Sequence, residues 1–126
     1  MDIYREQIID LHEHPLNFGE LETADYIHED DNPLCGDIIR IAINLDDSGR
    51  VYQVGWTGSG CAISQAAASL LTETIKGMSL TDIQTFPPER LLDLIGVPLS
   101  QARRKCALLP LKVLQAGVSG AVSTDE

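Results

Sequence analysis

The sequence predicts an α+β fold, in which a small antiparallel sheet is followed by a run of helices. Apolar residues alternate with other residues over residues 38–45 and again over 51–56, which is typical of two β-strands. After residue 61 the apolar residues recur at helical spacing instead, and glycines and prolines separate the segments. Because the strands come first and the helices later, this order favours an α+β fold over repeated βαβ units.

The N-terminal segment predicts a helix over residues 1–14, which ends at Pro15. The next segment indicates a loop that leads into a short strand near Thr23 to His28, at an edge of the sheet. The residues of the helix expected to contact the core are Ile3, Ile8 and Leu11.

Residues 38–57 predict a β-hairpin. The sequence "DDSG" forms its turn, and Gly49 can adopt the positive φ that such a turn requires. With a strict period of two, one face of the hairpin packs on the core. The residues expected on that face are Ile39, Ile41, Ile43 and Leu45 in the first strand and Tyr52, Val54 and Trp56 in the second.

Four helices are predicted after the hairpin, over residues 61–77, 79–85, 88–95 and 99–116. Pro110 is expected to kink the last helix or to end a turn there. The chain thus predicts a single domain over residues 1–117 and a disordered tail over residues 118–126. The residues at helical spacing in the first of these helices are Ile63, Ala66, Ala67, Leu70, Leu71 and Thr74.

The composition argues against several classes of function. The net charge is −10 and the sequence pI is about 4.5, so the phosphates of a nucleic acid would be repelled. No apolar run approaches the roughly 18 residues of a membrane span, and the charged start lacks the apolar core of a signal peptide. We therefore expect a cytoplasmic protein that binds neither nucleic acid nor membranes. Three cysteines in a reducing compartment indicate metal binding, reactivity or simple burial rather than a set of disulfides.

Two cysteines and one carboxylate are expected to meet at one end of the hairpin. Cys35 lies just before the first strand and Cys61 just after the second, and an antiparallel pair brings those two positions together. Asp37 belongs to the same end, and the glycines of "GSG" let the backbone turn closely there. Cys61 also begins a helix, where the unpaired amides favour a thiolate. The residues alone thus predict a thiol-rich site.

The spacing of Cys106 does not place it beside the other two cysteines. It follows a positive cluster, Arg103, Arg104 and Lys105, which favours the thiolate, the nucleophilic form of the side chain. The alternatives are that Cys106 is a small buried apolar residue and that the cluster is a solvated helix face. The histidines have no ligand-like spacing and are expected at the surface: His12, His14 and His28.

Three cysteine motifs, "NPLCGD", "GSGCAIS" and "RRKCALLPLKVL", resemble in order and sequence those of the U-type iron–sulfur scaffold family, which includes NifU N-terminal, IscU-like and SufU-like domains. The resemblance covers residues 1 to about 117. It implies an α+β domain in which about three antiparallel strands pack against several helices. It also implies that four residues hold a nascent [2Fe–2S] cluster or a zinc ion, with sulfur arriving as a persulfide from a cysteine desulfurase. These residues are Cys35, Asp37, Cys61 and Cys106.

The leading interpretation is a scaffold rather than an enzyme, which accepts persulfide sulfur and iron and transfers a nascent [2Fe–2S] cluster to acceptor proteins. The alternative is a zinc-dependent sulfurtransferase that relays persulfide sulfur, and a third interpretation is a structural zinc domain. Lys105 resembles the SufU-like branch, but the stretch between Cys61 and Cys106 is too short for the insertion that this branch usually carries. The chain therefore resembles a short SufU-like or intermediate member.

The two branches imply different persulfide acceptors. Cys35 resembles the acceptor of the SufU-like branch and is favoured, whereas Cys106 resembles that of the IscU-like branch. The sequence "LSQAR" stands where the IscU-like branch has its chaperone-binding Leu-Pro-Pro-Val-Lys, so no dedicated Hsp70-type chaperone is expected. The expected partners are a cysteine desulfurase and iron–sulfur acceptor proteins, and Arg103, Arg104 and Lys105 are candidates for docking them.

Overall fold

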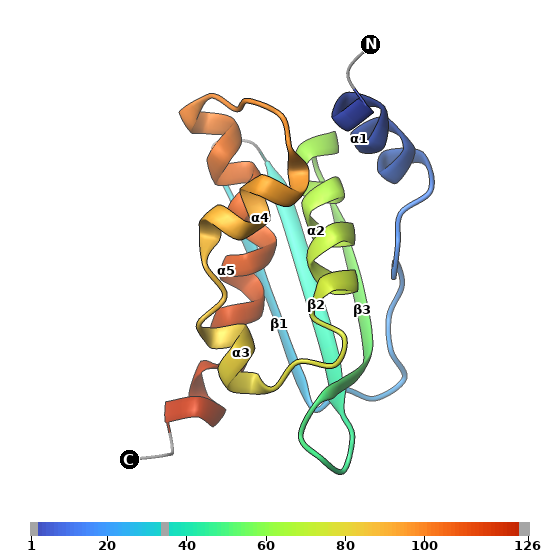
Figure 1. Ribbon diagram of the computed structural model, residues 1–126. Coiled ribbons are helices and arrows are strands. Elements are labelled where there is room, and N and C mark those ends of the chain that lie inside the picture. The colour runs from blue at the N-terminus through green and yellow to red at the C-terminus, as the bar shows by residue number, and fades with distance from the viewer. Residues whose placement is uncertain (1–2, 34–35, 124–126) are drawn as a thin grey trace.

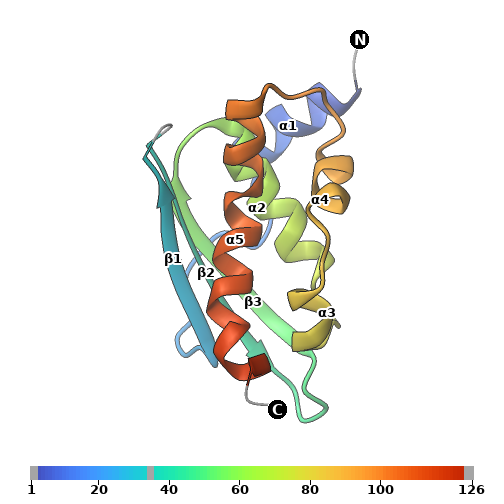
Figure 2. The same cartoon turned by 90° about the vertical axis from the view of Figure 1, so that its left-hand side faces the viewer.

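The computed structural model, which describes residues 3–33 and 36–123, contains a three-stranded antiparallel sheet whose one face is covered by helices (Figures 1 and 2). The strand order is β1-β2-β3, so β2 is central. This architecture is the predicted α+β fold. The strands are β1 (Tyr26–Asn32), β2 (Asp37–Leu45) and β3 (Val51–Ser59), and the helices are α1 (Ile3–Glu13), α2 (Ala62–Thr74), α3 (Leu80–Gln84), α4 (Pro88–Ile95) and α5 (Gln101–Ser123).

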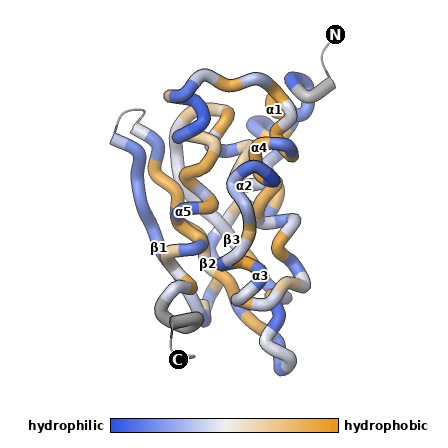
Figure 3. Tube along the Cα trace, turned by 60° about the vertical axis from the view of Figure 1, so that its left-hand side comes forward, coloured by the Kyte–Doolittle hydropathy of each residue, from blue (hydrophilic) through white to orange (hydrophobic). Residues whose placement is uncertain are grey.

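The helices form two layers on the sheet. Helices α2 and α5 lie directly against the strands, α3 and α4 pack on the outer side of these two, and α1 packs beside α2 (Figure 2). Figure 3 shows that β1 is largely hydrophilic and β2 largely hydrophobic, as expected for an edge strand and a central strand. In the part of the chain that the structure describes, no helix is both long and apolar enough to cross a membrane.

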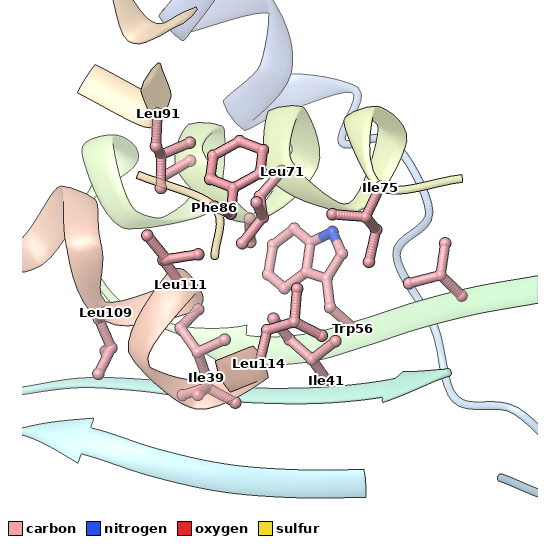
Figure 4. Close-up of a cluster of buried hydrophobic side chains, with 14 of the residues drawn as sticks. Ile39, Ile41, Trp56, Leu71, Ile75, Phe86, Leu91, Leu109, Leu111 and Leu114 are labelled. Atoms are coloured by element: carbon pink, nitrogen blue, oxygen red, sulfur yellow. The ribbon is translucent and has the colours of Figure 1, made fainter. Parts of the chain in front are cut away.

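Trp56 is the centre of the core and also fixes the loop that follows α1. Its side chain is 1% exposed and lies between the sheet and the Leu71 side of α2 (Figure 4). The indole Nε1–H donates to the Leu16 carbonyl at 2.7 Å, so the buried polar atom is satisfied. Two backbone hydrogen bonds, Trp56 N–H to Asn17 O at 3.0 Å and Gly19 N–H to Trp56 O at 2.8 Å, bind the loop to the free edge of β3. The loop therefore protects that edge from pairing with another chain.

The hairpin is confirmed, but the expectation that Tyr52 faces the core is wrong. Asn44 pairs with Gln53 and Leu45 with Val51, so Tyr52 is the extra residue of a β-bulge. Because a shift of one residue reverses the two faces of a strand, Val51 takes the inward position and is 2% exposed, whereas Tyr52 is 60% exposed.

The last helix is longer than predicted. It runs through Pro110 to Ser123, so residues 118–123, expected in a disordered tail, are helical instead. A proline inside a helix removes one backbone hydrogen bond, and the apolar face of α5 compensates by packing on the sheet and α2. The packing continues beyond the predicted end, because Val118 is fully buried and Gly117 lies against His28 so closely that a Cβ would stand 3.0 Å from the histidine Cβ.

The bulge gives a matched pair of substitutions. We expect Val51→Thr to lower the free energy of unfolding by about 1–3 kcal/mol, since it places a hydroxyl in the core. Tyr52→Thr should change it by no more than about 0.5 kcal/mol, because the side chain is exposed. Urea unfolding followed by Trp56 fluorescence measures both. A larger loss for Tyr52→Thr than for Val51→Thr would mean that strict alternation, and not the bulge, describes this strand.

Candidate metal centre

The antiparallel pairing of β2 and β3 creates the site at one end of the sheet, the upper end in Figure 1. Asp37 is the first residue of β2, and Cys61 follows the last residues of β3 as the N-cap of α2. The register pairs Ile38 with Ser59, so Asp37 and Cys61 both lie just beyond this pair, at the same end of the two strands. The sequence predicted this meeting from the order of the strands.

Asp37 is held in a fixed orientation. Its side chain is 0% exposed, and Oδ1 accepts a hydrogen bond from the Cys61 backbone N–H at 2.9 Å. The other oxygen, Oδ2, lies 3.7 Å from Cys61 Sγ. A buried carboxylate requires such partners. One oxygen is therefore engaged by the backbone, and the other is presented to the thiol.

Cys61 combines a fixed backbone with a partly accessible thiol. It is the N-cap of α2, with φ −75° and ψ 164°, and its side chain makes no capping hydrogen bond. The buried Ser64 donates from Oγ to the Cys61 carbonyl at 3.1 Å and stands 4.0 Å from Sγ. The unpaired N–H groups at a helix start favour negative charge, which is what a thiolate ligand carries.

Cys106 reaches the same point from the second turn of α5. It is 0% exposed, and the side-chain nitrogen of Asn32 at the end of β1 lies 3.9 Å from its Sγ. One donor atom each from Asp37, Cys61 and Cys106 lie within 4.8 Å of one another. The packing of α5 across β1 and β2 thus brings in the residue that sequence spacing could not place.

Of the remaining predicted site residues, Cys35 lies outside the described residues. Its neighbour Gly36 is described, and the Gly36 N–H donates to the Asn32 carbonyl at 2.8 Å. Arg103, Arg104 and Lys105 are exposed on the first turns of α5, next to the site. Among the residues that the structure describes, one of these three cations forms an ion pair: Arg104 pairs with Glu89 at 3.3 Å.

The histidines do not join this group of donors. Within residues 3–33 and 36–123, the group that could hold a metal consists of one carboxylate and two thiols. His12 and His14 are exposed on and after α1, and His28 packs against Gly117.

The donor set determines the chemistry that the site can support. Thiolates bind zinc and the iron of iron–sulfur clusters, and a carboxylate can complete a mixed set of ligands. A carboxylate is a harder ligand than a thiolate and exchanges more readily at thiophilic iron. The three donors therefore fit a thiophilic metal, with one ligand position suited to exchange.

The fold and this site together define a class of protein: a small α+β domain that gathers cysteines and an aspartate at one end of a three-stranded sheet. The chain belongs to the family described as the NifU-like N terminal domain, whose sequence model matches residues 3–122. The resemblance predicted from the cysteine motifs is thereby confirmed.

Three relatives illustrate the similarity. The chain is 35% identical to the zinc-dependent sulfurtransferase SufU of Bacillus subtilis, over 93% of this chain and 90% of that protein. It is 27% identical to the iron–sulfur cluster assembly scaffold protein IscU of Haemophilus influenzae, over 92% of this chain and 93% of that protein. The crystal structure of a protein described as an iron–sulfur cluster assembly scaffold for the SUF system, from Fervidobacterium islandicum, superimposes with a TM-score of 0.75. It is 26% identical and covers 90% of this chain and 94% of its own.

Sequence reasoning missed two residues that shape the site. Asn32 and Ser64 contact the sulfur atoms of Cys106 and Cys61. Asn32 stands within the "NPLCGD" motif, and Ser64 stands three residues after Cys61, which is the spacing of neighbours on a helix. Both signals were therefore present in the sequence. Gly60, which the sequence indicated as allowing a close turn, also leaves room for the carboxylate, because a Cβ there would overlap Asp37 Oδ1.

The contact at Gly60 predicts a specific defect. Gly60→Ala should displace the Asp37 carboxylate and weaken zinc binding by about 10–100-fold, the usual range for a disturbed ligand support. The measurement is competition with a chromophoric zinc chelator. Gly77→Ala is the matched control, because Gly77 also has a positive φ, of 88°, but nothing within 4 Å of its Cβ position and no place in the site. Equal zinc affinities for the Gly60 variant and the wild type would contradict this role.

Proposed function

We propose that this protein is an assembly scaffold, which receives persulfide sulfur from a cysteine desulfurase, combines it with iron and transfers a nascent [2Fe–2S] cluster to an acceptor protein. In this role the cluster is cargo, and the protein is not itself a catalyst. The observation that carries the proposal is the convergence of Asp37, Cys61 and Cys106 within 4.8 Å in a chain of this family. We further propose that Cys35 supplies the fourth ligand, and that the protein works in the cytoplasm.

The orientation of Asp37 supports release of the cargo. Oδ1 already accepts the Cys61 N–H, so only Oδ2 remains for iron, and the carboxylate would bind through one oxygen. Such a ligand is weaker than a thiolate at a cluster iron, and an incoming thiolate of an acceptor protein can replace it. Cys61 and Cys106 would then hold the cluster until the transfer is complete.

Sulfur would enter by thiol–persulfide exchange. The acceptor thiolate attacks the outer sulfur of the desulfurase persulfide, a new S–S bond forms, and the desulfurase cysteine leaves as a thiolate. Each sulfur gains two electrons on becoming sulfide, from ferrous iron and an external reductant. We favour Cys35 as the acceptor over Cys106, since Cys106 is fully buried. The backbone of Cys61 is tied to Asp37, which suits a resident ligand better than a sulfur carrier.

The second candidate function is a zinc-dependent sulfurtransferase, which would make the protein an enzyme. It is supported by the 35% identity to SufU of Bacillus subtilis and by Lys105, which precedes the third cysteine. The same donors fit zinc, since sulfur and carboxylate oxygen are among its usual ligands. Bound zinc would hold the thiols as thiolates. Under either function, the exposed cations Arg103, Arg104 and Lys105 are suited to docking an acidic surface of a partner.

Reconstitution separates these functions. We expect the protein, incubated anaerobically with iron and sulfide, to form a cluster with a visible chromophore and to pass it to an apo-ferredoxin. Cys35→Ser, Cys61→Ser and Cys106→Ser should each lose most of the chromophore. Asp37→Ala should retain the cluster longer and transfer it more slowly, because the exchangeable ligand is gone.

Metal analysis of the protein as isolated completes this test. Zinc that iron cannot displace, with persulfide passed on to another protein, would favour the sulfurtransferase. The same zinc without any uptake of sulfur would favour a structural zinc domain. Retention of the chromophore in all three cysteine variants would refute the ligand set.

The entry of sulfur is tested by mapping the persulfide. After incubation with a desulfurase and cysteine, mass spectrometry should find the added sulfur on Cys35 in the wild-type protein. It should be lost in Cys35→Ser and retained in Cys106→Ser, because the buried thiol of Cys106 is not needed for the first transfer. The reverse pattern would make Cys106 the acceptor.

A further inference from the structure

Asn32, the last residue of β1, lies between Gly36 and the helix that carries Cys106. Its backbone carbonyl accepts a hydrogen bond from the Gly36 N–H at 2.8 Å, and the residue pairs with Asp37 in the sheet register. Its side-chain nitrogen Nδ2 lies 3.9 Å from Cys106 Sγ. A single residue thus contacts both Gly36, which directly precedes β2, and the thiol on α5.

The surroundings of Cys106 make this contact important. Cys106 is 0% exposed, so bulk water does not solvate a negative charge on its sulfur. Cys61 differs, because its partial exposure lets water share in solvating its thiolate. A thiolate can only accept hydrogen bonds, and the amide nitrogen of Asn32 can only donate. The amide therefore has the right polarity to stabilise the buried sulfur.

The backbone position of Asn32 is fixed by the rest of the fold. The sheet pairing and the Gly36 hydrogen bond hold its backbone at the end of β1. Further along α5, the ion pair of Lys112 and Asp30 at 3.4 Å also links this helix to β1. The Asp31 backbone N–H and Lys112 hold the pKa of Asp30 below its usual value, so this carboxylate stays ionised. That pair is exposed and contributes little to stability.

We propose that Asn32 is a positioning residue, which donates a hydrogen bond from Nδ2 to Cys106 Sγ and makes Cys106 the least exchangeable thiolate ligand of the site. The proposal rests on the proposed function only in taking Cys106 as a metal ligand. An N–H···S hydrogen bond stabilises the sulfur lone pairs and fixes the side-chain rotamer, as partners of metal ligands commonly do. Cys106 would then stay on the metal while Asp37 exchanges.

The test uses cobalt(II) and zinc as probes and two variants that separate donation from shape. Asn32→Ala removes the amide. Asn32→Asp keeps nearly the same shape but places an acceptor oxygen against the sulfur. Ser59→Asp is the control, since it adds a carboxylate at the same end of the sheet on an exposed residue and leaves the Asn32 amide in place.

We expect Asn32→Ala to weaken zinc binding by about tenfold or more, and Asn32→Asp to weaken it further. In the cobalt protein both should move the thiolate-to-cobalt charge-transfer band to longer wavelength, because the sulfur lone pairs are less stabilised. Ser59→Asp should change zinc affinity by no more than about twofold and leave the band in place. Circular dichroism verifies that every variant is folded.

Three results would overturn the proposal. The first is wild-type zinc affinity in both Asn32 variants. The second is wild-type zinc affinity and an unshifted cobalt band in Asn32→Asp alone, and the third is an equal loss of zinc affinity in both variants without a shift of the band. The second and third would give Asn32 a role of shape only. Failure of the wild-type protein to show a thiolate-to-cobalt band would instead contradict the ligand set under the proposed function. The two failures are therefore distinguishable.

Discussion

The hydrogen bond from the Cys61 backbone N–H to Asp37 Oδ1 is the interaction on which the site depends. It joins the start of the central strand to the start of α2 and is possible only because β2 and β3 are antiparallel and in register at this end. Gly60 has no side chain to stand between them. The bond satisfies a buried carboxylate and an unpaired helix amide together, which would each be costly to bury alone. The same hydrogen bond therefore orients the Asp37 carboxylate and stabilises the fold at this end of the sheet.

The core holds this end of the molecule in place from a distance. Trp56 packs on α2 from the middle of β3 and ties the loop after α1 to the edge of the sheet. Helix α5 lies across β1 and β2 and packs on α2, so the sheet and both inner helices form one body. The donors that converge belong to different elements of that body. Their mutual distances are therefore set by packing in the core rather than by local loop structure.

The three donors differ in how they are held, and this difference suits the proposed function, in which the site would both bind a cluster and release it. Asp37 is anchored through one oxygen, Cys61 through its backbone, and Cys106 by burial within a helix. Thiolates held on rigid elements favour retention, while a carboxylate bound through one oxygen favours exchange. The positive residues that precede Cys106 stand in contrast to the net charge of −10, and their exposure leaves them available to a partner.

The sequence by itself determined the fold class, the hairpin, the order of the helices and the meeting of Asp37 with Cys61, because period and strand order are local properties of the chain. Its three cysteine motifs carried the resemblance to the family. It could not determine the bulge at Tyr52, since a register shift depends on how two strands pair. Nor could it predict where α5 ends, because the burial of Val118 keeps residues helical that small and acidic neighbours would leave disordered. The place of Cys106, and its contact with Asn32, follow from the packing of α5 across the sheet. Contacts between residues far apart in sequence are decided by the packing of complete elements, and only the tertiary structure contains that information.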